Sequence, residues 1–434
     1  MSLTEATAVD VPDVENPILP VFWDRPQAEI EADLERLRQR PMQKFPELPK
    51  VVQNPDDPAI SLAGSGAYVA TRHAEILHAS RHADVWSSAS GITVLDAPPE
   101  FNEFFGSMIA MDDPRHGRLR RIVAKGFTPR MLTMLEDSVT VLANQIIDDV
   151  AERGKVDFVV DVAAKLPLKI VCDLMGIDDR HLDFVFDQTN VILGISDPEY
   201  APADGTDVFT ALLTAGGALA ELMKEVAQSK QGVESDDLTS LLVNAEVDGE
   251  KLTDADIASF FVLLVVAGNE TTRNAISWGL TYLTANPDER ELWRSDFDRY
   301  AASAVEEIVR LASPVTYMRR TALQDTELGG VPVAAGEKVC MNYLAANRDE
   351  DVFVDPYRFD IARDPNPHVG FGGPGPHFCL GAHLARREIM VMFRELFRRL
   401  PDIEATGEPD VLAASFIHGV KHLDAEFSPV APGG

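Results

Sequence analysis

The chain has 434 residues, 45% of them hydrophobic, so it can bury a substantial core in one large domain or in two or three smaller ones. Its 39 Lys and Arg against 70 Asp and Glu give a formal net charge of −31, which argues against a general nucleic-acid binder or a protein held on anionic membranes. The three cysteines, Cys172, Cys340 and Cys379, are too far apart for a disulfide scaffold or a paired-cysteine zinc motif, so we expect a reducing cytoplasm.

The N-terminal residues show neither a basic start nor an apolar core, and they therefore predict neither a signal peptide nor a membrane anchor. The longest apolar run, residues 257–267, is too short to cross a bilayer. The chain shows no internal repeat and no low-complexity linker. We predict an N-terminal segment over residues 1–60 and a single unit over residues 61–434.

Helical periodicity dominates the chain, and strand signals are fewer and shorter. Helices are expected over residues 27–40, 131–153, 210–229, from 254 onward, and over 301–312. Strands are expected over residues 66–70 and in a hairpin at Gly329-Gly330, followed by a turn near Gly336. Residues 347–379 are rich in Pro, Asp and Gly, and long loops of this kind inside compact proteins are usually functional or disordered. The pattern predicts a mainly α fold with a minor β portion.

The loop HVGFGGPGPHFCLG, residues 368–381, leads into an amphipathic helix over residues 382–400. Glycines permit close backbone approach, and a helix start supplies free N–H groups and the positive end of a dipole. These features favour a thiolate at Cys379 and suit a metal–thiolate bond, because hydrogen bonds to sulfur tune its electron donation.

Other interpretations of this cysteine loop remain open from the residues alone. An inert buried thiol is the better interpretation for Cys172 and Cys340. A structural zinc site is weakly indicated, because His377 is the sole neighbouring ligand candidate for Cys379. A cysteine hydrolase would need a base and an oxyanion hole, which the sequence neither shows nor excludes.

The sequence FGGPGPHFCLG, with His377 two residues before Cys379 and Gly381 two after it, resembles the ligand loop of the haem-thiolate cytochromes P-450. The usual aromatic of that family lies seven residues before the cysteine, where this chain has Gly372; Phe371 lies eight before, as if one residue were inserted. Similar loops occur in bacterial members that act on sterol side chains and other lipids. The resemblance implies haem b as the cofactor, Cys379 as the iron ligand, and a single large domain of the family's mainly α fold.

The segment from Asp254 onward reads as a long buried helix, opened by Thr253 with Asp256 as a capping pair. Its middle, AGNETT, departs from helix preference and resembles the family's acid–threonine motif. The resemblance implies that the small residues make room for cofactor and oxygen and that an acid and a hydroxyl carry protons. Ala267 and Gly268 would make the room, and Glu270 and Thr271 would carry the protons. The alternative is that the glycine allows helix packing and the threonine bonds back to a carbonyl one turn earlier.

Glu307 and Arg310 lie three apart on a helix, which taken alone is common surface decoration. The family has such a pair at this place, where it organises the ligand loop, so we expect a structural role and no catalytic one. A haem also brings two propionates, which need cationic or hydrogen-bonding partners. The residues that match the family's propionate contacts are His116, Arg120, Arg320 and His377. Arg319 competes with Arg320, and spacing to Asp325 and Glu327 favours Arg320.

Two basic clusters interrupt the acidic composition. The first comprises Arg115, Arg118, Arg120, Arg121, Lys125 and Arg130. The second comprises Arg386, Arg387, Arg394, Arg398 and Arg399. Both flank segments assigned to the haem, so we expect an acidic ferredoxin to bind there, with Arg115, Arg118, Arg121, Arg386 and Arg387 as candidates. The alternative is that these arginines pair with the many acids.

The stretch 91–111 is apolar and aromatic, is not periodic throughout, and is expected to roof a pocket. Candidate substrate contacts are Phe101, Phe104, Phe105, Met108, Leu263, Leu264, Val315, Tyr317, Phe416 and Ile417. The alternative is plain core. The segments YMRRTALQDTEL and YLAANRDEDVF resemble bacterial terpene and sterol-lipid hydroxylases, which suggests a terpenoid, steroid or branched lipid.

The resemblance extends from about Tyr68 to Phe427 with four motifs in family order. It implies a cytoplasmic monooxygenase that inserts one atom of O2 into a C–H bond of an apolar molecule, with electrons from NAD(P)H relayed by a reductase and a ferredoxin. Two alternatives remain. A peroxide-using haem enzyme of the same fold should lack the acid–threonine pair, and a non-haem cysteine hydrolase would purify colourless.

Overall fold

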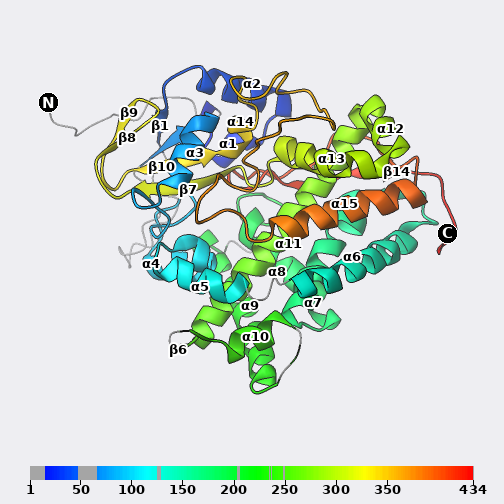
Figure 1. Ribbon diagram of the computed structural model, residues 1–434, viewed down its shortest axis with the longest axis horizontal. Coiled ribbons are helices and arrows are strands. Elements are labelled where there is room, and N and C mark those ends of the chain that lie inside the picture. The colour runs from blue at the N-terminus through cyan, green and yellow to red at the C-terminus, as the bar shows by residue number, and fades with distance from the viewer. Residues whose placement is uncertain are drawn as a thin grey trace.

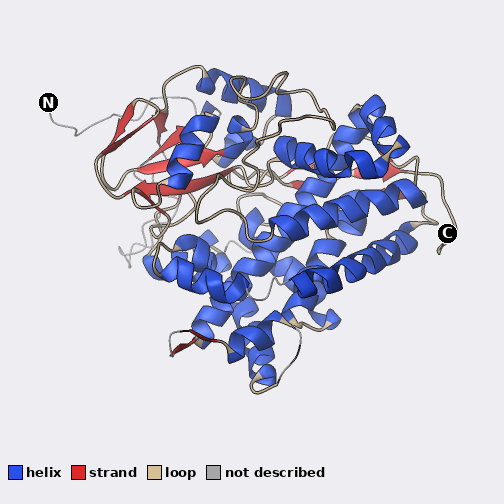
Figure 2. Ribbon diagram, viewed as in Figure 1, coloured by secondary structure: helices blue, strands red, loops and turns tan. Residues whose placement is uncertain are grey.

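The computed structural model describes residues 15–46, 66–124, 129–202, 206–233, 235, 237–247 and 250–433. Helices make up most of this part of the chain, and a small sheet lies at one side (Figure 1, Figure 2). The mainly α architecture with a minor β portion is confirmed.

All the expected helices are present, with ends shifted by a few residues. They are α2 Gln27–Arg38, α6 Pro129–Val150, α9 Val208–Lys230, α11 Asp254–Ala285, α13 Phe297–Ala312 and α15 Ala382–Arg399. The other α-helices described are α1 Pro20–Trp23, α3 His73–Arg81, α4 Pro99–Gly106, α5 Arg115–Ala124, α7 Lys165–Met175, α8 Leu182–Gly194, α10 Leu238–Asn244, α12 Pro287–Ser295 and α14 Tyr343–Ala346. Short tighter or wider turns are η2 Ser107–Ala110, η3 Val159–Ala163 and η4 Asp179–His181. The stretch 91–111, expected not to be helical throughout, is helical over Pro99–Gly106 and Ser107–Ala110.

Helix α11 forms the centre of the molecule. It begins with the expected capping box, in which the Thr253 hydroxyl accepts from the Asp256 amide at 3.1 Å and the Asp256 carboxylate accepts from the Thr253 amide. Helices α4, α7, α9, α13 and α15 all contact it. Because neighbours cover most of its faces, its residues are apolar nearly all round. This explains why α11 has the length and composition of a membrane-crossing helix although 56% of its apolar window is buried inside the molecule.

The main sheet has the strand order β1-β2-β10-β7-β3. Its strands are β1 Gln43–Phe45, β2 Ala67–Ala70, β3 Trp86–Ser87, β7 Tyr317–Ala322 and β10 Lys338–Asn342. The expected hairpin is present as β8 Thr326–Leu328 and β9 Val331–Val333. Gly329 and Gly330 join these strands with φ values of 59° and 81°, which side chains disfavour. The remaining strands are β4 Lys155–Asp157, β5 Glu246–Val247, β6 Glu250–Lys251, β11 Glu404–Ala405, β12 Asp410–Val411, β13 Val420–His422 and β14 Asp424–Glu426.

Part of the N-terminal segment 1–60 lies within the described residues and packs on the rest of the chain. Strand β1 pairs with β2 at the edge of the main sheet, and α2 contacts α14. Phe22 and Trp23 on α1 are buried beside Leu344. Residues 15–46 therefore share a core with the larger unit.

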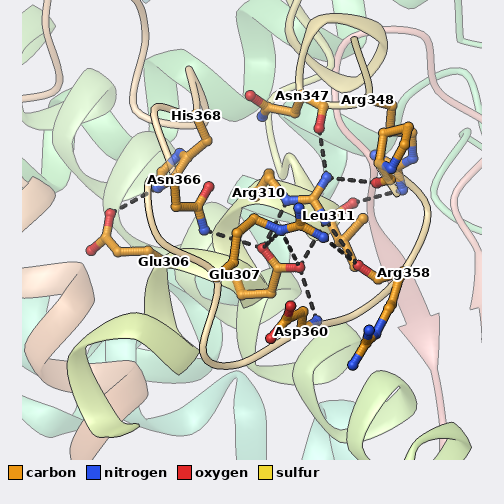
Figure 3. Close-up of polar contacts among 12 residues, drawn as sticks. Glu306, Glu307, Arg310, Leu311, Asn347, Arg348, Arg358, Asp360, Asn366 and His368 are labelled. Atoms are coloured by element: carbon orange, nitrogen blue, oxygen red, sulfur yellow. Dashed lines mark hydrogen bonds and ion pairs between the residues drawn. The ribbon is translucent and has the colours of Figure 1, made fainter. Parts of the chain in front are cut away.

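A buried ion pair on α13 holds the long loop that follows α14 (Figure 3). Glu307 and Arg310 are fully buried, and the Arg310 Nε donates to Glu307 Oε2 at 2.7 Å. The same guanidinium donates to the carbonyls of Asn347 and Pro356, each at 2.7 Å. Residues 347–381 contain no helix, as expected, so backbone carbonyls in this loop need donors from elsewhere, and Arg310 supplies them. The expected structural role of this pair agrees with these contacts.

Candidate active site

A mainly apolar cavity lies between α11, the cysteine loop, α5 and the end of β7. Cys379 lines it, and the surface that this residue exposes faces the cavity. Cys172 and Cys340 are buried elsewhere, and burial raises the pKa of the Cys172 thiol to about 12. Of the three cysteines, only Cys379 meets a space that could admit a ligand.

The backbone of the cysteine loop explains its glycines. The Cys379 amide donates to the Phe371 carbonyl at 3.0 Å, which closes the loop. Gly372 has a φ of 83°, a left-handed conformation that favours glycine. A Cβ on Gly375 would lie 2.0 Å from the Ser80 carbonyl oxygen, so only glycine lets the loop pack on the end of α3. The residue inserted before the cysteine is thus accommodated without moving Phe371 away from the cavity, which its side chain helps to line.

The electrostatic setting of Cys379 is mixed. Burial raises the pKa of its thiol, whereas the amides of Gly381 and Ala382 at the start of α15 lower it, as do the charges of Arg120 and Arg386. Donors and cations are therefore present around the sulfur, but they do not outweigh burial. A bound metal cation would favour the thiolate further, as expected for an iron ligand.

The middle of α11 forms one wall of the cavity. Ala267, Gly268 and Thr271 all line it. A Cβ on Gly268 would lie 2.6 Å from a methyl group of Val171, so this glycine also lets α7 pack closely. The Thr271 hydroxyl donates to the Ala267 carbonyl at 2.8 Å. Gly268 therefore allows close helix packing and Thr271 bonds back to a carbonyl, as the alternative interpretation has it, and both residues also face the cavity.

The Glu270 side chain lies behind the cavity wall. It is 1% exposed, forms an ion pair with Arg273 and is not part of the cavity lining. Arg273 in turn donates to the Asn190 side chain at 3.0 Å. Burial raises the pKa of Glu270 although Arg273 opposes the shift, and its Oε1 has no hydrogen-bond partner among the described residues. The acid is next to the cavity wall but is held on the side facing α8.

The expected cationic set does gather at one end of the cavity. Arg120, Arg320 and His377 line it, and the His116 ring stacks on His377 at 4.2 Å between centroids. The buried atoms His116 Nε2 and His377 Nδ1 have no partner in the described part of the chain. Burial, with help from neighbouring cations, lowers the pKa of His377 to about 2. The Asp113 carboxylate lies 3.5 Å from His116 Nδ1, on the other side of that ring. The two unpartnered ring nitrogens, with the guanidinium groups of Arg120 and Arg320, fit carboxylates supplied by a ligand.

Arg319 and Arg320 point to different partners from adjacent positions of β7. Arg319 forms an ion pair with Asp96 at 3.1 Å and donates to the Leu95 carbonyl. Arg320 is buried at the cavity, and its Nη1 donates to the Arg319 carbonyl at 2.8 Å. The choice of Arg320 agrees with the structure, but the reason is strand alternation, since neighbouring residues face opposite sides of a sheet.

These residues fit a haem. One thiol, a wall of small residues and a cluster of cationic donors lie around a single cavity, with orphaned nitrogen atoms where propionates would bind. Within the described ranges, no group of three or more His, Cys, Asp and Glu residues is placed to hold a metal ion, so the zinc interpretation gains no support.

The predicted substrate residues divide into two groups. Met108, Leu263, Leu264 and Val315 line the cavity. The cavity lining does not include Phe101, Phe104, Phe105, Tyr317, Phe416 and Ile417. The cavity lining also contains residues that were not among the candidates, and these include Ile92, Ile109, Leu174, Phe260 and Met318.

Packing explains why the second group stays outside the cavity. Phe104 and Phe105 lie against Gly216 of α9, where a Cβ would be 2.8 Å from either ring. Phe101 stacks on Phe209, also in α9, at 5.1 Å. Phe416 packs on the Tyr317 ring at 5.5 Å, and Ile417 belongs to a small buried cluster. Tyr317 and Ile417 are buried, and the four phenylalanines are half-buried against other elements, in keeping with the alternative that the sequence left open.

Most of the basic candidates have acidic partners. Arg115 pairs with Glu103 and Asp256, and Arg386 pairs with Glu306. In the second cluster, Arg394, Arg398 and Arg399 pair with Asp298, Glu395 and Asp148. Arg121 is exposed, whereas Lys125 and the side chain of Arg130 lie outside the described residues. Pairing with acids, the alternative interpretation, therefore accounts for most of the second cluster and, among the described residues of the first, for Arg115.

Glu388 is a further acid at the cavity that the sequence analysis missed. It lines the cavity from α15, is 2% exposed, and its Oε2 has no partner among the described residues. Burial raises its pKa from 4.5 to about 8. The available signal was a glutamate on the apolar face of an amphipathic helix.

Glu388→Gln is expected to stabilise the protein at neutral pH. Between pH 4.5 and about 8 the folded state holds a proton on Glu388 that the unfolded state releases, so the free energy of unfolding of the native chain falls as pH rises. In the variant the free energy of unfolding does not fall for this reason. The difference in free energy of unfolding between the variant and the native chain should therefore grow by roughly 2–3 kcal/mol between pH 5.5 and 7.5 in denaturant titrations. Glu395→Gln on the same helix, where Arg398 pairs with the carboxylate at 2.9 Å, is the control and should show no such growth. An advantage that stays constant with pH would contradict a neutral Glu388.

Comparison with known proteins gives consistent matches. The profile of the family Cytochrome P450 matches residues 204–401. The methyl-branched lipid omega-hydroxylase of Mycobacterium tuberculosis (strain H37Rv) is 50% identical over 370 residues, 85% of each chain. The steroid C26-monooxygenase of Rhodococcus jostii is 38% identical over 97% of this chain and 88% of that protein. A solved Mycobacterium marinum cytochrome P450 in complex with pseudoionone is 41% identical, with a TM-score of 0.88, over 97% of this chain and all of the other.

Proposed function

The chain belongs to the cytochrome P450 family and is a haem-containing monooxygenase, and from this premise we propose that it hydroxylates a methyl-branched lipid or terpenoid chain. The observation that carries the proposal is the aliphatic cavity wall that reaches Cys379. Ile109, Leu174, Leu263, Leu264 and Val315 bring branched aliphatic side chains to it. Such a wall suits a flexible apolar chain without polar groups near the reacting end.

The relatives support a lipid and favour a branched chain over a steroid. The relative named a methyl-branched lipid omega-hydroxylase is 50% identical to this chain, whereas the one named a steroid C26-monooxygenase is 38% identical. The solved neighbour binds pseudoionone according to its description. We take the steroid side chain as the second candidate.

The haem site would be held by residues already described. Cys379 would bind the iron, and Arg120, Arg320, His116 and His377 would bind the propionates. The small residues Ala267, Gly268 and Gly381 would leave space next to the cofactor. Phe371 lines the cavity at the cysteine loop. When bound, the haem supplies reductive activation of O2 and transfer of one oxygen atom to carbon.

Proton delivery would use the acid and hydroxyl of α11. Thr271 faces the cavity, and rotation of its hydroxyl away from the Ala267 carbonyl would let it donate a hydrogen bond into the cavity. Glu270 would pass a proton to this hydroxyl after leaving Arg273, because its raised pKa favours the protonated form and Oε1 is unbonded. Over one cycle, substrate, O2, two electrons and two protons become the alcohol and one water.

The electrons would come from NAD(P)H through a reductase and an acidic ferredoxin in the cytoplasm. The net charge of −31 makes a local basic surface distinctive. The charges of Arg115 and Arg386 are already compensated by acids, so the exposed Arg121 is the better candidate for that surface.

The proposal is tested by incubating the holoenzyme with a methyl-branched fatty alcohol, a linear chain of equal length, and a sterol, with NADPH, reductase and ferredoxin. We expect the branched chain to be hydroxylated at least about tenfold faster than either control, because a difference of about 1.4 kcal/mol in binding at the transition state suffices. No product should form without ferredoxin. Preference for the sterol would move the function to the second candidate, and no oxidation of any lipid would refute the proposal.

In the same assay, Thr271→Ala is expected to lower product formed per NADPH consumed by on the order of 10²-fold, because proton transfer loses its positioned hydroxyl. Thr281→Ala is the matched control, because the Thr281 hydroxyl makes the same kind of bond back along the helix, to the Ser277 carbonyl at 3.2 Å, but Thr281 does not line the cavity. This variant should stay within about threefold of the native enzyme. Equal product per NADPH in the Thr271 variant and the native enzyme would refute the proton route.

A further inference from the structure

Helices α13 and α15 are joined by two arginines of similar geometry. Arg386 pairs with Glu306, and its guanidinium carbon lies 4.2 Å from the centroid of the Phe371 ring. Arg394, eight residues later, pairs with Asp298, eight residues earlier, and lies 4.9 Å from the Phe297 ring. We call each of these ion pairs with its aromatic ring a bracket. The first is the more buried, with Glu306 25% exposed against 84% for Asp298, and of the two only the first holds a residue of the cysteine loop.

The first bracket ties three segments together through one carboxylate. Glu306 Oε2 accepts from Arg386 Nη2 at 2.9 Å and lies 2.8 Å from His368 Nε2. The other ring nitrogen of His368 accepts from the Gly370 amide at 3.1 Å. Figure 3 shows Glu306 and His368 beside the buried pair of Glu307 and Arg310. The start of the cysteine loop is thereby fixed to both helices.

Phe371 connects the Arg386 side chain with the backbone of Cys379. Its ring is covered by Arg386, and its carbonyl accepts the Cys379 amide at 3.0 Å. The Arg386 side chain is 31% exposed, so water screens its charge only in part.

We propose that Glu306 and Arg386 are positioning residues that set the electron donation of the Cys379 thiolate, and so the reduction potential of the iron. Hydrogen bonds and charges around an axial ligand tune the potential of a haem. In this chain Phe371 lies one residue further from the cysteine than the family pattern has it, and the bracket is what holds its ring. The inference rests on the haem-thiolate site and is independent of which lipid is oxidised.

Removing the charge of Arg386 and removing the charge of Glu306 should shift the reduction potential in opposite directions. Arg386 favours the reduced iron, which carries one positive charge fewer, and Glu306 compensates that effect. Removing the arginine charge should therefore make reduction harder, and removing the carboxylate charge should make it easier. A merely structural role would shift the potential in the same direction in both variants, since both loosen the loop.

The test is a spectroelectrochemical titration of substrate-free holoenzyme, without ferredoxin. Arg386→Met is expected to lower the equilibrium constant for one-electron reduction about tenfold, a shift of about 59 mV, and Glu306→Gln to raise it severalfold. Arg394→Met and Asp298→Asn are the matched controls and should remain within about twofold of the native protein. If Arg386→Met does not load haem, the reduction potentials of Arg386→Lys and Glu306→Gln are compared instead. The lysine keeps the charge and should leave the potential near the native value, whereas Glu306→Gln should still raise it.

Three results would overturn the inference: equal shifts in the Arg394 and Arg386 variants, shifts of the same sign for Arg386 and Glu306, or no shift in either. A failure to oxidise lipids would leave the potentials measurable. Failure of the proposed substrate is thus distinguishable from failure of this inference.

Discussion

Cys379→Ala is expected to abolish monooxygenase activity, with a loss of ~10³-fold or more, because the iron loses the thiolate that donates electron density for O–O bond cleavage. The reduced protein with carbon monoxide should lose the red-shifted band typical of thiolate-bound haem. The cavity places no other cysteine near the cationic set that would hold the propionates, since Cys172 and Cys340 are buried elsewhere. The spectrum of the reduced protein with carbon monoxide checks the prediction directly.

Cys340→Ala is the control for this variant. Cys340 lies on the central strand β10 and is 1% exposed, so its removal costs only a small packing loss and should leave the band in place. Persistence of the red-shifted band in the Cys379 variant, or its absence from the native protein, would contradict the assignment of the ligand. A colourless native protein would favour the cysteine hydrolase instead.

The second large effect concerns the buried pair on α13. Arg310→Ala leaves Glu307 fully buried with its charge less compensated, and it removes the donor to the carbonyls of Asn347, Pro356 and Arg358. Breaking one partner of a buried pair costs about 3–5 kcal/mol. Arg363 also donates to Glu307 at 3.1 Å and offsets part of this cost. We therefore expect a loss of about 3 kcal/mol in the free energy of unfolding, with poor retention of haem.

Denaturant titration and the haem content of the purified protein measure this loss. Arg398→Ala is the matched control, because Arg398 also pairs with a glutamate three residues away but is 52% exposed, and it should cost less than about 1 kcal/mol. Arg310→Lys should fall between the two, since lysine keeps the charge but cannot reach several carbonyls at once. Native stability of Arg310→Ala would show that the loop does not depend on this pair.

Local patterns in the sequence determined much of the fold and the central residue of the site. Six helices follow from the spacing of apolar residues, because one face of each helix must be buried whatever lies against it. They are α2, α6, α9, α11, α13 and α15. The capping box at Thr253 is a contact between near neighbours in the chain. The glycines before Cys379 indicated a loop that packs closely on another segment, and Gly375 shows this contact.

The site residues that could not be predicted depend on contacts between distant segments. Phe104 and Phe105 carry the same apolar signal as Met108, yet α9 covers the first two and leaves the third at the cavity. Similarly, the sequence does not show that Glu270 is tied to Arg273, with Asn190 beyond it. Periodicity reports that a residue is buried, but it does not report which surface buries it.

The sequence by itself therefore determined the class of fold, the cysteine that meets the cavity and the set of cationic residues at one end of it. Only the tertiary structure decided which apolar side chains line the cavity, which arginines are already paired, and that Arg386 covers Phe371 from Glu306. The reason is physical: Glu306 and Arg386 are 80 residues apart, and their contact arises from the packing of α13 on α15, which no spacing along the chain encodes.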